Sequence, residues 1–145
     1  MQIINDYSHT IIDTLQEVSS IEVFQDGRHS VLSQGSKEFH DIAGQLLDKF
    51  ANARVDPAFG VSLHDETIKQ IQSGTWLKLN FDKTIEKNGL PFDALLFQLE
   101  DGYGINLIRE YQGRYEGRCI YLNFFDNIAL KDLIKNNLLL SMVMK

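Results

Sequence analysis

The spacing of apolar residues changes along the chain, from mainly helical repeats before residue 75 to mainly two-residue alternation after it. The strongest helical repeat lies between residues 39 and 50, where apolar side chains recur every three or four positions. That period places them on one face of an α-helix, and Ser36 stands where it can cap the first turn. The residues of this stripe are Phe39, Ile42, Ala43, Leu46, Leu47 and Phe50.

Helical patterns also occur near both ends of the chain. Residues 4–18 carry an apolar stripe with the same spacing, and this helix is expected to end near Ser19. Asp126 is expected to cap a last helix that runs to about Asn136. The apolar segment Leu138–Met144 follows, and three fates fit it: an extension of that helix, an edge strand, or a contact with a second subunit.

A short helix is expected between Asp65 and Gln72. Asp65 can cap its first turn, while Ile68 and Ile71 have the spacing of an inward face. Gly74 is expected to close it in the left-handed conformation that commonly ends a helix. The stretch before it, residues 52–64, has no helical period and contains one of the two prolines. It is expected to run over the surface or along an edge.

Strand-like patterns begin as a hairpin and return as a longer series. Asp26 and Gly27 separate two strand-like runs, and this pair predicts a type I′ turn because both central positions require a positive φ. Between Thr75 and Phe125 four such runs follow one another, with glycine-containing turns between them. Short connections between consecutive strands predict an antiparallel meander. The runs are TWLKLNFD, DALLFQLE, GINLIREYQ and RYEGRCIYLNFF.

Together these elements predict an α+β fold. Its antiparallel sheet is formed by the N-terminal hairpin plus the four-stranded meander, and helices pack on one face. The Phe39–Phe50 stripe is expected to make the main contact with the sheet. A chain of 145 residues fits one domain, so residues 1–145 are expected to form a single globular α+β domain.

Composition and charge narrow the class of protein. The net charge of −6 and the scattered lysines and arginines argue against a nucleic-acid partner, because phosphate binding depends on clustered positive charge. The longest strongly apolar run, LLLSMVM, is far shorter than the roughly 20 residues that cross a bilayer. The first residues lack the basic and apolar regions of a signal peptide. We therefore expect an acidic cytoplasmic protein with no membrane association.

The familiar motifs of catalysis and cofactor binding are absent from the sequence. The four histidines lie far apart without metal-ligand spacing, so no metal and no cofactor is expected. Neither a nucleophilic serine motif nor a phosphate-binding glycine loop occurs. Cys119 is the single cysteine, and it lies inside a predicted strand, where a buried and unreactive thiol is expected.

One polar cluster interrupts the predicted meander around residues 109–118. The alternation changes phase between Tyr115 and the strand that follows, and a one-residue bulge at Gly117 would reconcile the two phases. Arg109, Arg118, Glu116 and Tyr115 could then line a cleft that binds an anionic ligand. The alternative is a solvated set of cross-strand Arg–Glu pairs, each worth about a few tenths of a kcal/mol.

Two classes of function are consistent with this sequence. The first is a small non-enzymatic interaction or regulatory module of bacterial type, immunity-like or adaptor-like, that uses Trp76, Tyr111 and Tyr121 on the exposed face of the meander. Trp and Tyr are enriched at the centres of protein interfaces. A homodimer through that face or through Leu138–Met144 is a variant of this hypothesis. The second class is an anionic-ligand-binding protein or enzyme that uses the cleft near the arginines.

Overall fold

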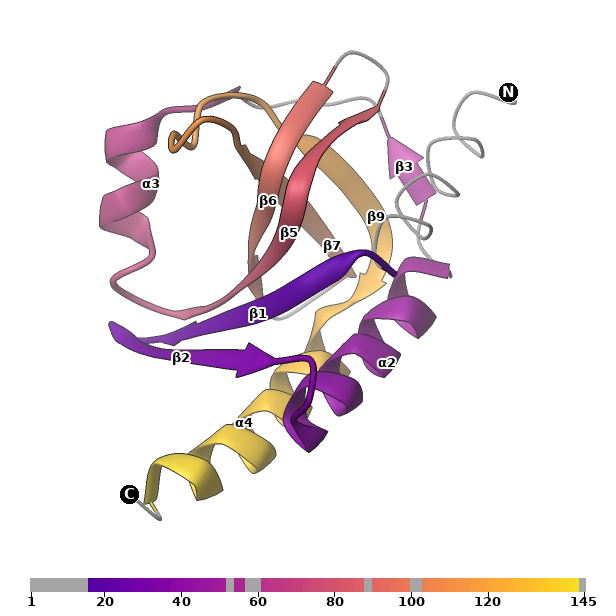
Figure 1. Cartoon of the computed structure of the whole chain (residues 1–145), viewed down its shortest axis with the longest axis vertical. Coiled ribbons are helices and arrows are strands. Elements are labelled where there is room, and N and C mark those ends of the chain that lie inside the picture. Colours follow the sequence, from indigo (N-terminus) through magenta and orange to yellow (C-terminus); the bar gives the residue numbers. More distant parts are fainter. Residues whose placement is uncertain (1–15, 52–53, 57–60, 88–89, 100–102, 144–145) are drawn as a thin grey trace.

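The protein forms one antiparallel sheet of seven strands in the order β2-β1-β5-β6-β7-β9-β3, flanked by helices (Figure 1). The structure is a computed structural model that describes residues 16–51, 54–56, 61–87, 90–99 and 103–143. The strands of the sheet are β1 (Val18–Gln25), β2 (Arg28–Ser33), β3 (Arg54–Asp56), β5 (Thr75–Lys87), β6 (Leu90–Leu99), β7 (Tyr103–Glu110) and β9 (Ile120–Asp126). A separate pair joins β4 (Val61–Ser62) to β8 (Gly117–Arg118), and the helices are α2 (Lys37–Ala51), α3 (His64–Gln70) and α4 (Asn127–Val143).

The predicted fold class is confirmed. The β1–β2 hairpin adds to the meander through antiparallel pairing of β1 with β5. The turn between β1 and β2 has φ of 48° at Asp26 and 86° at Gly27, as a type I′ turn requires. The same turn is fixed to the start of β5, because the backbone N–H of Gly74 donates to the Asp26 carboxylate at 2.9 Å. Local turn chemistry therefore sets the register of the first three strands.

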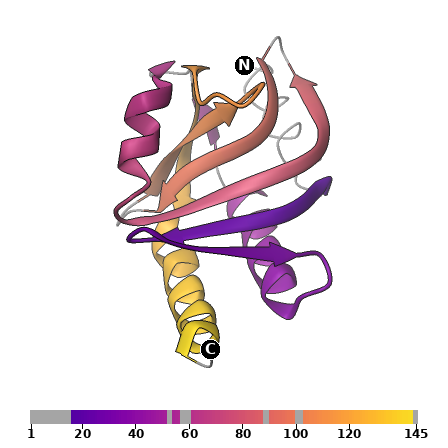
Figure 2. The same ribbon diagram turned by 60° about the vertical axis from the view of Figure 1, so that its left-hand side comes forward.

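The two long helices cover one face of the sheet, which we call the first face. Figures 1 and 2 show α2 and α4 side by side there, with α3 well separated from them. From α2, Phe39, Ile42, Leu46 and Phe50 are buried against the sheet, as the predicted stripe requires. Ser36 accepts a hydrogen bond from the N–H of Phe39 at 3.1 Å and caps the helix as expected.

Aromatic rings form the centre of this core. Phe97 of β6 contacts Phe50 of α2 and Phe125 of β9 edge-on, with ring centroids 6.4 and 6.2 Å apart. Phe50 and Phe125 also contact each other, at 5.2 Å. Because Phe97 and Phe125 are fully buried, this trio joins a helix to two strands that are not adjacent in the sheet. Edge-to-face rings of this kind stabilise a core beyond the burial of their area.

Several predicted boundaries differ from the structure. Most of the predicted 4–18 helix lies outside the described residues, and its expected end is wrong because β1 begins at Val18. Residue Ile68 is 41% exposed rather than inward-facing, because α3 turns only Ile71 and Thr67 toward the sheet. The last helix, α4, continues past Asn136 to Val143, so the segment from Leu138 to Val143 is helical.

Two neighbouring leucines on α2 test the packing of the first face. Leu46 is 1% exposed and Leu47 is 36% exposed, although the sequence places both in the apolar stripe. We expect Leu46→Ala to lower the free energy of unfolding by about 2–5 kcal/mol, because it leaves a cavity in the core. Leu47→Ala is the matched control and should cost about 1 kcal/mol or less. Urea denaturation followed by circular dichroism measures both, and equal losses would contradict this packing.

Candidate functional site

The opposite face of the sheet, which we call the second face, carries a smaller apolar cluster. Strand alternation places these residues opposite the aromatic core, since neighbouring side chains point to opposite faces. The α3 helix and the segment after β7 lie over this face and contribute Ile71 and Tyr115. The buried members are Ile71, Trp76, Leu96, Ile108, Tyr115 and Cys119.

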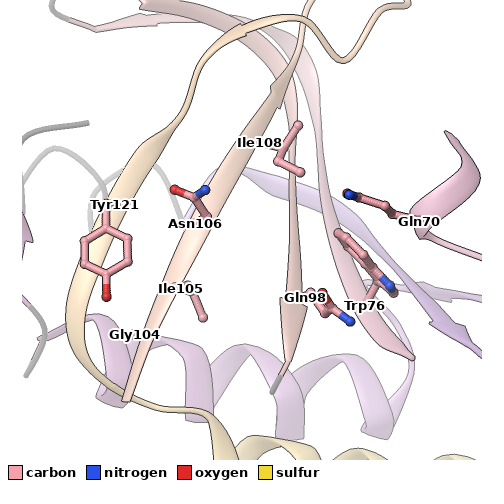
Figure 3. A pocket seen from close by; sticks show the side chains of 8 residues that line it. All are labelled: Gln70, Trp76, Gln98, Gly104, Ile105, Asn106, Ile108 and Tyr121. Atoms are coloured by element: carbon pink, nitrogen blue, oxygen red, sulfur yellow. The ribbon is translucent and has the colours of Figure 1, made fainter. Parts of the chain in front are cut away.

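Beside this cluster lies a hollow between α3 and the sheet, which we call the α3 groove. Its first part has a volume of about 380 Å³ (Figure 3). A second part of about 260 Å³ shares Gln70, Asn106 and Ile108 with the first, so the two parts adjoin. The first part is lined by Gln70, Trp76, Gln98, Gly104, Ile105, Asn106, Ile108 and Tyr121. The second part is lined by Val61, Ser62, Leu63, Glu66, Gln70, Asn106, Ile108 and Cys119.

The groove lies where β6 and β7 separate. Their pairing covers three residue pairs, from Ala94 opposite Glu110 to Leu96 opposite Ile108, and in the described residues it goes no further. Beyond that point each strand keeps only its outer neighbour: β6 stays paired with β5, and β7 with β9. Figure 3 shows the two strands close together near Ile108 and apart near Gly104.

Two cross-strand pairs border this separation. Trp76 stands opposite Gln98 on β5 and β6, and Asn106 stands opposite Tyr121 on β7 and β9. Trp76 is 3% exposed, and its indole Nε1 donates to the Ser73 carbonyl at 2.8 Å. The expectation that Trp76 lies on an exposed surface is therefore corrected. The residue lies on the predicted face of the sheet, but its ring is buried and forms a wall of the groove.

Gly104 lies against Tyr121 at one side of the groove. It has a φ of 144°, and a Cβ added there would come within 2.5 Å of the Tyr121 hydroxyl. Its carbonyl accepts a hydrogen bond from the buried side chain of Asn127, the first residue of α4, at 2.8 Å. The close approach of the tyrosine ring thus requires glycine at this position.

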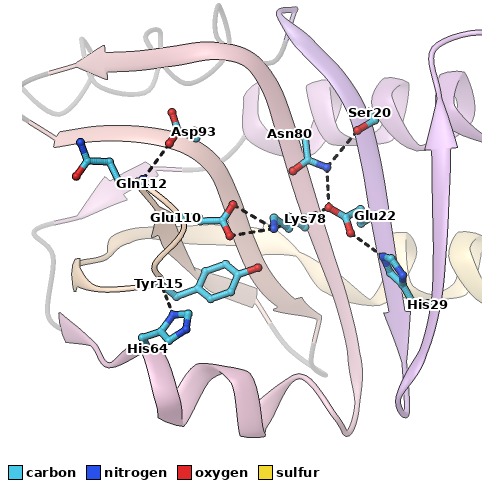
Figure 4. A network of polar contacts seen from close by, with 10 residues as sticks. All are labelled: Ser20, Glu22, His29, His64, Lys78, Asn80, Asp93, Glu110, Gln112 and Tyr115. Atoms are coloured by element: carbon cyan, nitrogen blue, oxygen red, sulfur yellow. Dashed lines mark hydrogen bonds and ion pairs between the residues drawn. The ribbon is translucent and has the colours of Figure 1, made fainter.

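A half-buried charge cluster crosses the second face next to the groove (Figure 4). The Lys78 ammonium lies 3.1 Å from Glu110 Oε1, 3.8 Å from Glu22 Oε2, and 5.1 Å from the centroid of the Tyr115 ring. Burial alone would lower the pKa of Lys78, but interactions with Tyr115 and Glu110 raise it overall. Lys78 is therefore a fixed positive charge, unsuited to act as a neutral nucleophile.

Glu22 is held in its ionised form by its neighbours. Burial alone would raise its pKa, but hydrogen bonds from Asn80 and His29 and the charge of Lys78 lower it overall. Asn80 donates to Glu22 at 2.8 Å and to the Ser20 hydroxyl at 3.1 Å. These contacts link β1 to β5 by side chains as well as by the strand ladder.

Tyr115 fixes the segment after β7 onto this cluster. Its backbone N–H donates to His64 Nδ1 at 3.1 Å, and the two rings stack with centroids 5.8 Å apart. Burial raises the pKa of the Tyr115 hydroxyl, although Lys78 opposes the shift. Since His64 is the first residue of α3, this contact also sets the position of that helix beside the groove.

The four residues proposed for an anionic-ligand cleft lie in different surroundings. Arg109 is buried, with Nε donating to the Arg118 carbonyl at 2.8 Å and Nη1 to the Pro91 carbonyl at 2.7 Å. Tyr115 is buried with its ring against Lys78, whereas Glu116 is exposed and pairs with Arg114 at 2.7 Å. Arg118 is also exposed. The proposed cleft stays a prediction, with Arg118 as its accessible cation.

The predicted irregularity near Gly117 exists as an interruption of the strand. Gly117 and Arg118 leave the main sheet to pair with β4, and β9 begins at Ile120. The interruption explains the change of phase, because Tyr115 faces the second cluster while Ile120 faces the first. Gly117 has a φ of 108°, and a Cβ there would lie 2.9 Å from Arg109 Nη2.

The remaining candidate residues are placed as follows. Tyr111 is half-buried and pairs with Arg114 across a tight turn, away from the residues that line the groove. Cys119 is 2% exposed, and burial raises its pKa, which keeps the thiol protonated.

Within the described ranges, no three His, Cys, Asp or Glu side chains gather as a metal site would require. Those ranges also hold no helix with the length and apolar character of a membrane span.

Sequence reasoning selected Trp76 and Tyr121, which line the same groove. It did not select the amide side chains of the groove. Gln70, Gln98 and Asn106 carry no motif, and they come together only because β6 and β7 separate. Comparisons of the chain with protein-family models, curated proteins and solved structures find no match.

The charge cluster predicts a pH-dependent stability. A pKa lowered on folding from the ordinary 4.5 means that Glu22 stabilises the fold above that pH and loses this effect as the pH falls below it. We expect Glu22→Gln to lower the free energy of unfolding by about 1 kcal/mol at pH 7, with the difference shrinking toward zero near pH 3. Urea denaturation at both pH values measures it.

The control for this experiment is Glu17→Gln, which removes an exposed ion pair with Lys83 at 3.4 Å. It should change the free energy of unfolding by about 0.5 kcal/mol or less. A Glu22→Gln effect of equal size at pH 7 and pH 3 would show that the carboxylate charge is not responsible.

Gly117 and Gly113 form a matched pair for the strand interruption. Both have positive φ, 108° and 81°, but a Cβ at Gly113 meets nothing within 4 Å. Gly113→Ala should therefore cost only backbone strain, about 1 kcal/mol. Gly117→Ala should cost more, about 2–4 kcal/mol, because it also displaces the buried Arg109 guanidinium. Thermal and urea unfolding of both variants check this order, which the reverse ranking would contradict.

Proposed function

We propose that this protein is a non-enzymatic interaction module that binds a segment of a partner protein in the α3 groove. The observation that carries the proposal is the groove itself, which lies on the face of the sheet that α2 and α4 leave uncovered. Its volume is in the range of pockets that bind ligands, roughly 300–1,000 Å³. It extends from the buried Trp76 to an apolar rim on β4 and α3.

That rim supports a protein partner. Val61 and Leu63 line the second part of the groove and are 68% and 61% exposed. Large apolar side chains next to a concave polar surface are typical of protein-binding sites. A partner segment that entered the groove would cover Val61 and Leu63 and remove their apolar area from water.

The chemistry of the described residues favours binding over catalysis. Lys78, Glu22 and Glu110 are held by one another, and the Cys119 thiol is kept protonated. A nucleophile and a base within hydrogen-bonding distance, as covalent catalysis requires, do not occur together in the groove lining. Binding, rather than bond-making, is what this lining can perform.

A peptide selection tests the proposal, because it requires no assumption about which protein supplies the segment. The full-length chain is immobilised and used to select from a phage-displayed library of random peptides, and the enriched peptides are measured by fluorescence anisotropy. We expect Val61→Glu to weaken binding by about tenfold or more, because it puts a charge on the apolar rim. Val31→Glu is the matched control, since Val31 is also a strand valine, 59% exposed, on the distant strand β2.

Equal binding by the wild type and both variants would overturn the groove as the contact surface. A selection that enriches no peptide would overturn the proposed function. Light scattering at the concentrations used establishes whether a second copy of the chain already occupies the groove; a dimer lost in Val61→Glu but kept in Val31→Glu would replace the foreign partner with self-association.

A further inference from the structure

The separation of β6 and β7 leaves main-chain groups without strand partners inside the sheet. If their register continued, Gln98 would stand opposite Asn106, but the ladder ends at Leu96 and Ile108. In an antiparallel ladder, alternate residues direct their N–H and C=O groups toward each neighbouring strand. Alternate residues of 97–99 and 105–107 therefore direct these groups toward the gap between β6 and β7, not to a partner strand.

Three amide side chains add to this set of unpaired groups. Gln98 and Asn106 flank the separation on the second face, and Gln70 reaches it from α3 (Figure 3). Their side-chain amides make no hydrogen bond with any part of the chain that the structure describes. Each amide both donates and accepts, as a peptide group does.

The charge of the groove lining further limits the chemical class of ligand that it can bind. In the first part of the groove no Asp, Glu, Lys, Arg or His side chain is among the lining residues. In the second part Glu66 is the one charged lining residue. An acidic ligand would meet no cation in this lining, whereas a neutral segment with a basic residue near Glu66 complements it.

A sugar is a poorer match to the same lining. Carbohydrate sites present an open aromatic face. Trp76 is 3% exposed and its Nε1 is already bonded to Ser73, and Tyr121, the other aromatic residue of the lining, is half-buried. What the groove presents is the edges of two strands and a set of amides. Extended peptides bind to strand edges mainly through their main chain.

We infer that the α3 groove recognises the main chain of an extended peptide, through the unpaired edges of β6 and β7 and the amides of Gln70, Gln98 and Asn106. This inference rests on the proposed function and specifies how the partner segment is recognised. The segment is neutral along the first part of the groove. It places an apolar residue against Val61 and Leu63, with a basic residue next to Glu66.

Methylation of single main-chain nitrogens in a selected peptide tests this mode of recognition. An N-methyl group removes one donor and leaves the side chains unchanged. We expect a loss of about tenfold or more in affinity at consecutive positions of the segment that lies between β6 and β7, and little change at positions outside it. A peptide between two strand edges turns its N–H groups alternately toward one edge and the other. Fluorescence anisotropy with the full-length chain measures each peptide.

Variants of the protein provide a second test of the same inference. Gln98→Leu and Asn106→Leu each replace an amide side chain with an apolar side chain of similar size. Each should weaken binding of the unmethylated peptide by about fivefold to tenfold. Gln72→Leu is the control, since Gln72 is an exposed glutamine that does not line the groove. Hydrogen exchange followed by NMR adds a direct readout: the amides of residues 97–99 and 105–107 that face the groove should gain protection when the peptide binds.

The outcomes separate this inference from the proposed function. If peptides bind and Val61→Glu abolishes binding, but every N-methyl peptide binds normally, main-chain recognition is overturned and the interaction function stands. If no peptide is selected, both are overturned. Binding of a neutral oligosaccharide that Asn106→Leu weakens, in place of any peptide, would also overturn both.

Discussion

The aromatic contact of Phe97 with Phe50 and Phe125 is the interaction on which the rest of the structure depends. It draws β6 and β9 against α2 on the first face, so β6 does not need a continuous ladder with β7 to stay in place. Leu99, Ile105 and Leu107, which stand where the two strands separate, belong to the core of the first face. An open groove can exist on the second face because the first face is packed so completely.

The second face uses electrostatics where the first uses packing. Lys78 lies between two carboxylates on β1 and β7, and the Tyr115 ring covers it. Removing one member weakens the cluster, since it leaves a half-buried charge with one partner fewer. The cluster therefore keeps β1, β5 and β7 in fixed relation while the strands beside it are unpaired. The rigid polar cluster and the unpaired strand edges are neighbours on the same face.

The sequence predicted the elements more completely than their pairing. Alternation along β5 and the positive-φ turn at Asp26-Gly27 are local properties, so the hairpin and the meander could be recognised without a structure. The separation of β6 and β7 could not, because Phe97-Gln98-Leu99 and Ile105-Asn106-Leu107 alternate in the same way whether or not they are paired. The predicted site near Arg109 was drawn from a cluster of charges and from the change of phase near Gly117. It could not reveal that a buried arginine would bind two backbone carbonyls.

Strand pairing attaches the α3 side of the groove to the rest of the protein at few points. Only two residue pairs, Val61 with Arg118 and Ser62 with Gly117, join β4 to β8 within the described chain. Regions held by few pairs open locally at a lower free energy than the core of a domain. The main sheet and its aromatic core can therefore stay intact when the β4–β8 pair opens. A bound segment that bridges α3 and β7 would hold this part of the molecule closed.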